Sequence, residues 1–175
     1  MKTKKRILSI ILAAVLILTA ALPAAAASDP LTYQKGSRLE SDGTVSSFYK
    51  VVSCVKTASG EITVPDTYQG LEAREIGDGA FADCGGITAV NIPSSVDRIG
   101  ANAFENCLGL EKVSYQGSAF ESSSRVIGVA AFRNCIALKT VLLPGGLTEI
   151  KDEAFKKCAA LTGVSLPDTL KKIGK

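Results

Sequence analysis

The sequence predicts an α/β repeat solenoid, a right-handed stack of similar coils, and three recurring features predict it. The motif Ala-Phe-x-x-Cys occurs four times, with phenylalanines at 81, 104, 132 and 155 that are spaced by 23, 28 and 23 residues. A strand-like pattern ending in proline recurs at 87–93, 138–144 and 161–167. An isoleucine follows seven residues after the last apolar residue of each pattern, at positions 99, 150 and 173. A fixed period of this size indicates coils that stack and share one core.

Each coil is expected to contain the same elements in the same order. In the segment 90–92 the apolar residues alternate with a polar one, as in a strand with one buried face. Pro93 ends that strand because proline cannot donate a hydrogen bond to the sheet. Parallel strands are therefore expected at 87–92, 110–115, 138–143 and 161–166. The isoleucine forms a second apolar corner, and Ala-Phe-x-x-Cys fits a short helical turn with its phenylalanine directed inward.

The first 27 residues have the pattern of a secretory signal peptide. A basic start at 2–6 precedes an apolar run at 7–22, and three alanines at 25–27 suit cleavage before Ser28. The alternative, a retained membrane anchor, calls for a longer apolar run than this one. Residues 28–60 are then a leader that is loose up to Thr44 and continues into a capping strand within 45–55. Residues 61–175 form the solenoid, with four complete coils and one incomplete coil.

Removal of the signal peptide changes the charge of the protein. The full chain has 20 basic and 17 acidic residues, and four of the basic ones lie in the signal peptide. The mature protein is therefore close to neutral, which leaves no electrostatic basis for binding nucleic acid or an anionic membrane. We expect it to be secreted or held at the cell surface, with no membrane contact after cleavage.

The residue types needed for common catalytic sites are scarce. The chain contains no histidine, which excludes Ser-His and Cys-His nucleophilic pairs and the commonest metal ligand. The carboxylates are scattered, and the segment Gly77-Asp78-Gly79 lacks the lysine of a phosphate-binding loop. We expect no enzyme activity, no cofactor and no metal. A hydrolase that uses carboxylates is the remaining catalytic alternative.

Five cysteines in a secreted protein raise the question of disulfide bonds. Cys84, Cys107, Cys135 and Cys158 hold the same position in successive coils, which stack about 4.8 Å apart. Equivalent side chains point the same way, so their Cβ atoms also lie about 4.8 Å apart, beyond the usual disulfide range. We expect buried free cysteines that act as small hydrophobic residues. Metal binding by the thiol column is an alternative, but the column lacks tetrahedral convergence.

The full repeat resembles a known family. The pattern L-x-x-V-x-I-P-x-x-V-x-x-I-G-x-x-A-F-x-x-C is similar to the BspA-like bacterial leucine-rich repeat, and 87–107 matches it throughout. The resemblance covers about 62–175 and implies a curved solenoid with a parallel sheet on its concave face, found on secreted or surface proteins. Some members of the family are associated with adhesion. Coils one and three depart from the pattern by five extra residues at one corner, within 64–76 and 115–127, and Lys151 replaces the usual glycine.

The extra corner residues contain the best candidates for contact with a partner. They bring aromatic and arginine side chains outside the regular core positions, and these residue types are enriched at interface hot spots. The outward positions of the expected strands add polar candidates. Our candidate binding residues are Tyr68, Tyr115, Phe120, Arg125, Asn91 and Lys112. An alternative interpretation is that Tyr68 and Phe120 fold back to fill gaps in the core beside Ala73 and Ser124.

Two non-catalytic functions fit the sequence. The first is a secreted or cell-surface recognition module, of the adhesion type, that binds an extracellular protein or a glycan. The second is a structural spacer, or part of a larger surface protein whose binding or anchoring region lies beyond Lys175. Because the last coil stops before its own Ala-Phe-x-x-Cys, we also expect end-to-end self-association through an uncapped C-terminal coil.

The free-cysteine interpretation makes a direct prediction. The mature protein, unfolded without reductant, is expected to show five thiols when titrated with a chromogenic disulfide reagent, because the coil spacing keeps neighbouring sulfur atoms from bonding. A count of three or one thiols would contradict the proposed column.

Overall fold

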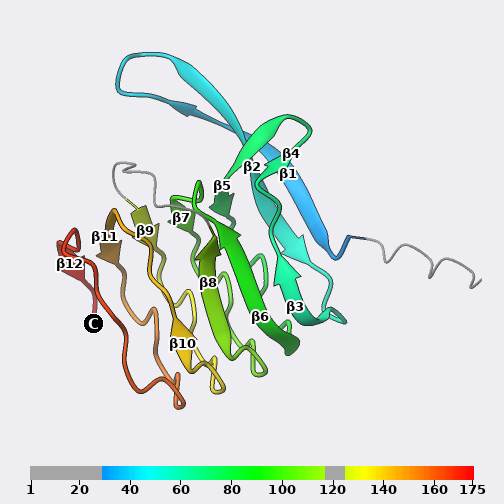
Figure 1. Cartoon of the computed structure of the whole chain (residues 1–175), viewed down its shortest axis with the longest axis vertical. Coiled ribbons are helices and arrows are strands. Elements are labelled where there is room, and N and C mark those ends of the chain that lie inside the picture. Colours follow the sequence, from blue (N-terminus) through cyan, green and yellow to red (C-terminus); the bar gives the residue numbers. More distant parts are fainter. Residues whose placement is uncertain (1–28, 117–124) are drawn as a thin grey trace, which may run out of the picture.

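The computed structural model describes residues 29–116 and 125–175, which form a β-solenoid of about five turns (Figure 1). Two sheets run along the stack. Sheet A follows the order β1 (Leu31–Leu39), β2 (Val45–Cys54), β5 (Leu71–Ile76), β7 (Arg98–Ile99), β9 (Arg125–Ile127), β11 (Leu147–Ile150) and β12 (Lys172–Ile173), and β4 (Thr67–Tyr68) pairs with β5. Sheet B follows the order β10 (Thr140–Val141), β8 (Lys112–Gln116), β6 (Gly86–Pro93) and β3 (Ser59–Thr63).

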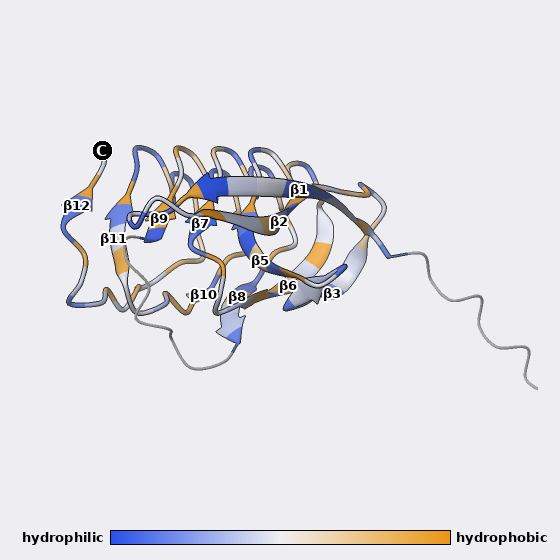
Figure 2. Ribbon diagram, turned by 90° about the horizontal axis from the view of Figure 1, so that it is seen from above, coloured by the Kyte–Doolittle hydropathy of each residue, from blue (hydrophilic) through white to orange (hydrophobic). Residues whose placement is uncertain are grey.

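The coils repeat with a constant register. Each one passes through sheet B, crosses to sheet A, and returns through Ala-Phe-x-x-Cys; we number the coils one to five by β3, β6, β8, β10 and the segment 161–166. Val90 of β6 lies between Ile62 and Val113, its partners in the two neighbouring strands. Figure 2 shows the coils side by side in one row, with the two sheets on different sides of the stack. The predicted parallel solenoid is therefore confirmed.

The expected helical turn at Ala-Phe-x-x-Cys is wrong: the described residues contain no helix. Two residues in each of these segments have left-handed backbone angles, with φ between 53° and 64°. The first of the two immediately precedes the alanine of the motif, at positions 79, 102, 130 and 153. The second immediately precedes the cysteine, at positions 83, 106, 134 and 157. An α-helix needs negative φ at every residue, so the segment forms successive tight turns instead.

These turns bind each coil to the next one. The alternation of backbone angles directs the phenylalanine N–H out of its own coil, and Phe104 N donates to Ala131 O at 2.7 Å. Phe81 and Phe132 do the same toward Ala103 and Ala154. A helix would use these N–H groups within the segment, whereas the turn satisfies them between coils and so continues the stack.

The phenylalanines form the predicted internal row. The ring centroids of Phe81, Phe104, Phe132 and Phe155 are separated by 4.8, 5.0 and 5.2 Å in sequence order, and the ring planes are within 14° of parallel. The first three rings are fully buried, and Phe155 is half-buried at the end of the row.

The cysteines lie beside this row as free thiols, as expected. In coils two to four the thiol reaches back to the preceding coil: Cys107 Sγ donates to Phe81 O at 3.0 Å, and Cys135 Sγ donates to Phe104 O at 3.0 Å. A small apolar side chain with one weak donor therefore suits this buried position. Burial raises the pKa of Cys54 to about 12. The pKa of Cys107 is also raised, chiefly by its contact with Cys135 and secondly by burial. These thiols therefore stay protonated and unreactive at neutral pH.

The second apolar corner is itself a parallel sheet, which the sequence did not predict. The residue after each isoleucine donates to the isoleucine carbonyl one coil earlier, as in Gly100 N to Ile76 O at 2.8 Å. The backbones approach so closely here that a Cβ on Gly128 would lie 2.6 Å from the carbonyl carbon of Gly100. Lys151 occupies the same position in coil four, and its N–H still donates to Ile127 O at 3.0 Å.

The strand expected at 161–166 is wrong: these residues form no strand, and β10 is the last strand of sheet B in the described chain. Residues 169–174 remain bound to coil four, through Lys171 N to Thr148 O at 2.9 Å and Gly174 N to Ile150 O at 2.7 Å. A terminal coil has a neighbour on one side only, and Gly163 weakens the centre of this segment as a strand.

The N-terminal segment was expected to be loose up to Thr44, and this is wrong. Residues 31–39 form β1, which pairs with the predicted capping strand β2 in an antiparallel hairpin. The hairpin extends above the rest of sheet A in Figure 1. Arg38 binds the buried Asp97 of coil two through two hydrogen bonds of 2.6 and 2.9 Å. The order of β1 thus depends on partners that are distant in the sequence.

The aromatic row predicts a large effect of a core truncation. Phe104→Ala is expected to lower the free energy of unfolding by about 3–5 kcal/mol, the range for a buried aromatic side chain, because it removes contacts with both neighbouring rings. Urea denaturation followed by circular dichroism measures the change. The matched control is Leu108→Ala, an exposed position in the same coil, which is expected to change stability by less than about 0.5 kcal/mol. Equal losses for the two variants would contradict the internal row.

Candidate functional site

Sheet B presents a polar outer face. The face comprises the outward side chains of β3, β6, β8 and β10, together with Leu142 after β10. Asn91 is at its centre, where its amide nitrogen donates to Thr63 Oγ1 at 3.3 Å and to a Glu61 carboxylate oxygen. Its amide oxygen accepts a hydrogen bond of 2.6 Å from Ser114 Oγ. These side chains therefore bind one another across three strands.

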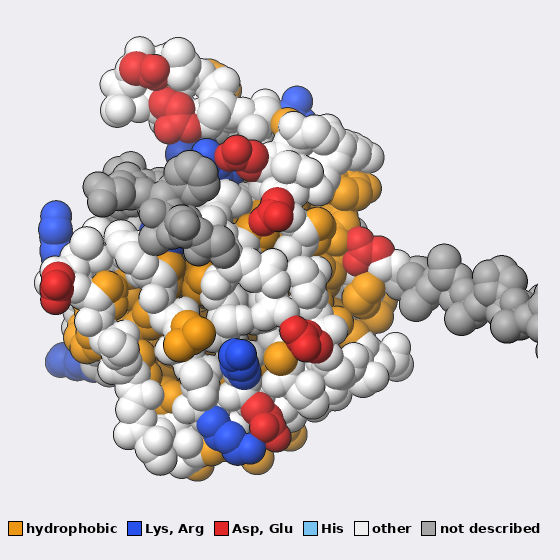
Figure 3. Space-filling view, viewed as in Figure 1, with side chains coloured by type: hydrophobic (Ala, Val, Ile, Leu, Met, Phe, Trp, Pro, Cys, Tyr) orange, Lys and Arg blue, Asp and Glu red, His pale blue; other side chains and the backbone are white. Residues whose placement is uncertain are grey.

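Charge on this face is mixed. Lys112 is exposed next to the Asn91 network, and Glu111 beside it pairs with Lys139 at 2.8 Å. Figure 3, viewed from this side, shows acidic and basic side chains spread over the face rather than gathered into one patch. The sheet B face can thus offer hydrogen bonds to a partner, but no strong field of one sign.

The extra residues of coil one form a compact hairpin rather than an open loop. β4 pairs with β5 across the two-residue turn Gln69-Gly70, in which both residues have positive φ, of 51° and 76°. This backbone geometry suits the twist of a tight hairpin, with Tyr68 at the end of β4.

Tyr68 belongs to an aromatic group that we call the tyrosine cluster, made of Tyr33, Tyr49 and Tyr68. Its ring lies 4.3 Å from that of Tyr33 and 6.0 Å from that of Tyr49, between centroids. Tyr49 is buried, Tyr33 is half-buried, and Tyr68 is 38% exposed. Burial raises the pKa of both Tyr33 and Tyr49, and the carboxylate of Asp29 adds to the effect on Tyr33. The tyrosine cluster therefore packs beside β5 of coil one and still exposes part of the Tyr68 ring.

The sequence did not point to Tyr33 as part of this site. Tyr33 is on β1, in the segment taken as a loose leader, and it meets Tyr68 only because the hairpin β1–β2 continues sheet A. Tyr49 lies opposite Ala73 where β2 pairs with β5. The gap in the core that the sequence predicted beside Ala73 is therefore next to a large aromatic residue.

The remaining candidates are not gathered in one place. Tyr115, at the end of β8, is half-buried and packs against the core, and burial raises its pKa. Arg125 is 2% exposed, and its guanidinium donates to Ser94 O at 2.6 Å, so it is a buried residue rather than a surface contact. Phe120 lies outside the described residues.

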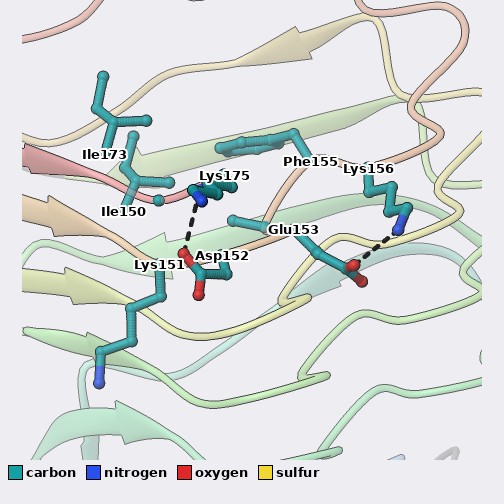
Figure 4. Close-up of a pocket in the computed structure, with 10 residues that line it drawn as sticks. Ile150, Lys151, Asp152, Glu153, Phe155, Lys156, Ile173 and Lys175 are labelled. Atoms are coloured by element: carbon teal, nitrogen blue, oxygen red, sulfur yellow. Dashed lines mark hydrogen bonds and ion pairs between the residues drawn. The ribbon is translucent and has the colours of Figure 1, made fainter.

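The C-terminal end of the solenoid contains a hollow, shown in Figure 4. Ile150 and Ile173 lie together on one side of it, and Phe155 lies on the other. The N–H of Lys175 donates to Asp152 Oδ1 at 3.1 Å, and Lys156 pairs with Glu153 at 2.6 Å. The hollow is the open end of the apolar interior.

The part of the chain that the structure describes contains no metal-binding constellation. No three cysteine, aspartate or glutamate side chains gather there in a way that could hold a metal ion. Within 29–116 and 125–175 there is also no helix of the length and hydrophobicity needed to cross a membrane. The predicted signal peptide lies outside these ranges.

Stacked coils with this repeat define a leucine-rich-repeat protein of the bacterial type. The family model described as "BspA type Leucine rich repeat region (6 copies)" matches residues 56–175, which is more than half of the chain. The chain therefore belongs to the BspA-type leucine-rich repeat family. A comparison with curated proteins gives no match.

Three solved structures are similar to this chain to different degrees. A leucine-rich repeat protein of T. pallidum is 28% identical, with a TM-score of 0.66 over 80% of this chain and 61% of that chain. A leucine-rich cell surface protein from Faecalibacterium prausnitzii is 23% identical, with a TM-score of 0.44 over 79% of this chain and 48% of that one. A leucine-rich repeat protein from Bacteroides capillosus is 21% identical, with a TM-score of 0.44 and coverage of 84% and 95%. The chain spans less than two thirds of the first two proteins.

The tyrosine cluster predicts a modest role for Tyr68 in stability. Tyr68→Ser is expected to lower the free energy of unfolding by about 1 kcal/mol, because the ring loses its contacts with two aromatic neighbours but is already partly exposed. Urea denaturation measures the loss. Gln34→Ser, at an exposed position beside Tyr33 on β1, is the control and is expected to be neutral. A loss above about 3 kcal/mol would assign Tyr68 wholly to the core.

Proposed function

We propose that the protein is a secreted or cell-surface module that binds an extracellular protein or a surface glycan without catalysis. The observation that carries this proposal is the tyrosine cluster, whose Tyr68 ring is 38% exposed at the end of a tight hairpin on a repeat scaffold. Tyrosine is enriched at interface hot spots because it offers a large contact area with a polar tip at low entropic cost. The predicted signal peptide supports the extracellular location.

The contact surface in this proposal extends from Tyr68 to the sheet B face. Lys112 supplies an exposed donor there, beside Asn91, and the parallel strands hold these side chains at a fixed spacing of about 4.8 Å per coil. A partner that bridges several coils would meet a surface that needs little reordering, which favours binding.

A structural spacer is the second candidate, and one observation favours it. The polar groups around Asn91 already satisfy one another through Glu61, Thr63 and Ser114, so a partner would gain little from replacing those bonds. A spacer would need only the stack itself.

A binding screen separates these functions. Purified residues 28–175 are applied to panels of immobilised extracellular matrix proteins and bacterial surface polysaccharides. A specific ligand is expected, and Tyr68→Ser is expected to weaken its binding at least about tenfold, a loss of about 1.4 kcal/mol. Gln34→Ser controls for changes in the hairpin itself. Absence of any ligand, or a ligand that tolerates both Tyr68→Ser and Lys112→Glu, would favour the spacer.

A further inference from the structure

The tyrosine cluster has a carboxylate on each of the two chain segments that lead into it. Asp29 lies just before β1, and its carboxylate accepts hydrogen bonds from the Tyr33 hydroxyl at 2.5 Å and from a backbone N–H of β1 at 2.9 Å. Asp66 lies just before β4 and follows Pro65, whose carbonyl accepts the hydroxyl of Tyr49. Both aspartates are exposed, and Figure 3 shows acidic side chains next to hydrophobic surface near β1 and β4. Negative charge therefore lies beside the rings.

These carboxylates have no ion-pair partner in the described chain. Every ion pair among the described residues joins other side chains. Lys35 is opposite Tyr49 in the register of β1 and β2, yet it is exposed and pairs with neither Asp29 nor Asp66. Burial raises the pKa of Tyr49, and the charges of Asp66 and Asp29 raise it further. The cluster therefore has a negative surrounding potential.

The exposed ring favours the same sign of partner. The face of an aromatic ring is electron-rich, so a cation placed over it is attracted. The protein already uses this contact once, where the guanidinium of Arg38 lies 5.5 Å from the centroid of the Phe48 ring. No lysine or arginine of the described chain lies in this way over a ring of the tyrosine cluster. Tyr68, which is 38% exposed, thus offers aromatic surface to a cation from outside.

We propose that the tyrosine cluster, together with Asp29 and Asp66, binds an arginine-bearing segment of an extracellular protein. A guanidinium is planar and weakly hydrated, so it can stack on an aromatic face and also donate hydrogen bonds to a carboxylate. This inference rests on the proposed binding function and narrows its ligand to a basic protein surface. A neutral glycan would also stack on the ring but would leave the carboxylates uncompensated, and an anionic surface polymer would be repelled by them.

The test measures binding of labelled decapeptides to the mature protein, residues 28–175. Arginine, serine or glutamate alternates with glycine in the peptides, and fluorescence anisotropy gives the dissociation constants. At about 50 mM salt the arginine peptide is expected to bind at least about tenfold more tightly than either of the others. At about 500 mM salt its binding is expected to weaken at least about fivefold, because salt screens exposed carboxylates.

Substitutions separate the contribution of the ring from that of the charge. Tyr68→Phe keeps an aromatic ring and is expected to keep the affinity within about twofold, whereas Tyr68→Leu keeps only apolar surface and is expected to weaken binding about threefold. Asp66→Asn keeps the size of the side chain, removes its charge, and is expected to weaken binding about threefold at low salt. Asp168→Asn makes the same change of net charge at an exposed position of coil five and is expected to have no effect. Circular dichroism confirms that each variant is folded.

Several results would overturn the inference. Equal binding of all the peptides is one, and equal losses for Asp66→Asn and Asp168→Asn are another. An affinity for the arginine peptide that Tyr68→Leu leaves unchanged is a third. The proposed function itself fails if the binding screen finds no ligand. The inference fails alone if the screen finds a ligand, such as a glycan, that requires Tyr68 but is insensitive to salt and is not displaced by the arginine peptide.

Discussion

The structure depends on the hydrogen bond from the phenylalanine N–H of each Ala-Phe-x-x-Cys turn to the next coil. The bond exists because two residues of the turn have left-handed φ, which directs alternate N–H groups along the stack. It keeps the aromatic rings at about 5 Å. The phenylalanine carbonyl accepts both the cysteine N–H of its own turn and the cysteine thiol of the following coil. One backbone choice therefore positions the row of rings, the thiol column and the spacing of both sheets.

The backbone groups of coil one find their partners in the segment that precedes it. At the N-terminal end, Cys54 and Lys56 supply donors to the carbonyls of coil one, and the hairpin completes sheet A. The bidentate contact of Arg38 with the buried Asp97 fastens that hairpin to coil two. In coil five, by contrast, the described residues Leu166 and Ile173 are exposed.

Much of the fold could be predicted from the sequence, but little of the site. The repeat spacing was enough to place the aromatic row and the free cysteines, because equivalent positions in a stack have equivalent surroundings. The candidate binding residues do not follow from the repeat pattern in the same way. Arg125 looked like a surface contact on a projecting corner, yet it is buried against Ser94, and Tyr68 acquired neighbours from a segment that has no repeat pattern.

The sequence by itself determined the family, the number of coils, and the inward row of rings and thiols, since periodicity records which side chains share a core. Only the tertiary structure decided that Ala-Phe-x-x-Cys is a turn, that the isoleucine corner is a second sheet, and that β1 is ordered. Each of these outcomes depends on hydrogen bonds to a neighbouring coil or strand. Local residue patterns describe the preferences of one coil alone, whereas the partners of its backbone groups exist only in the stack.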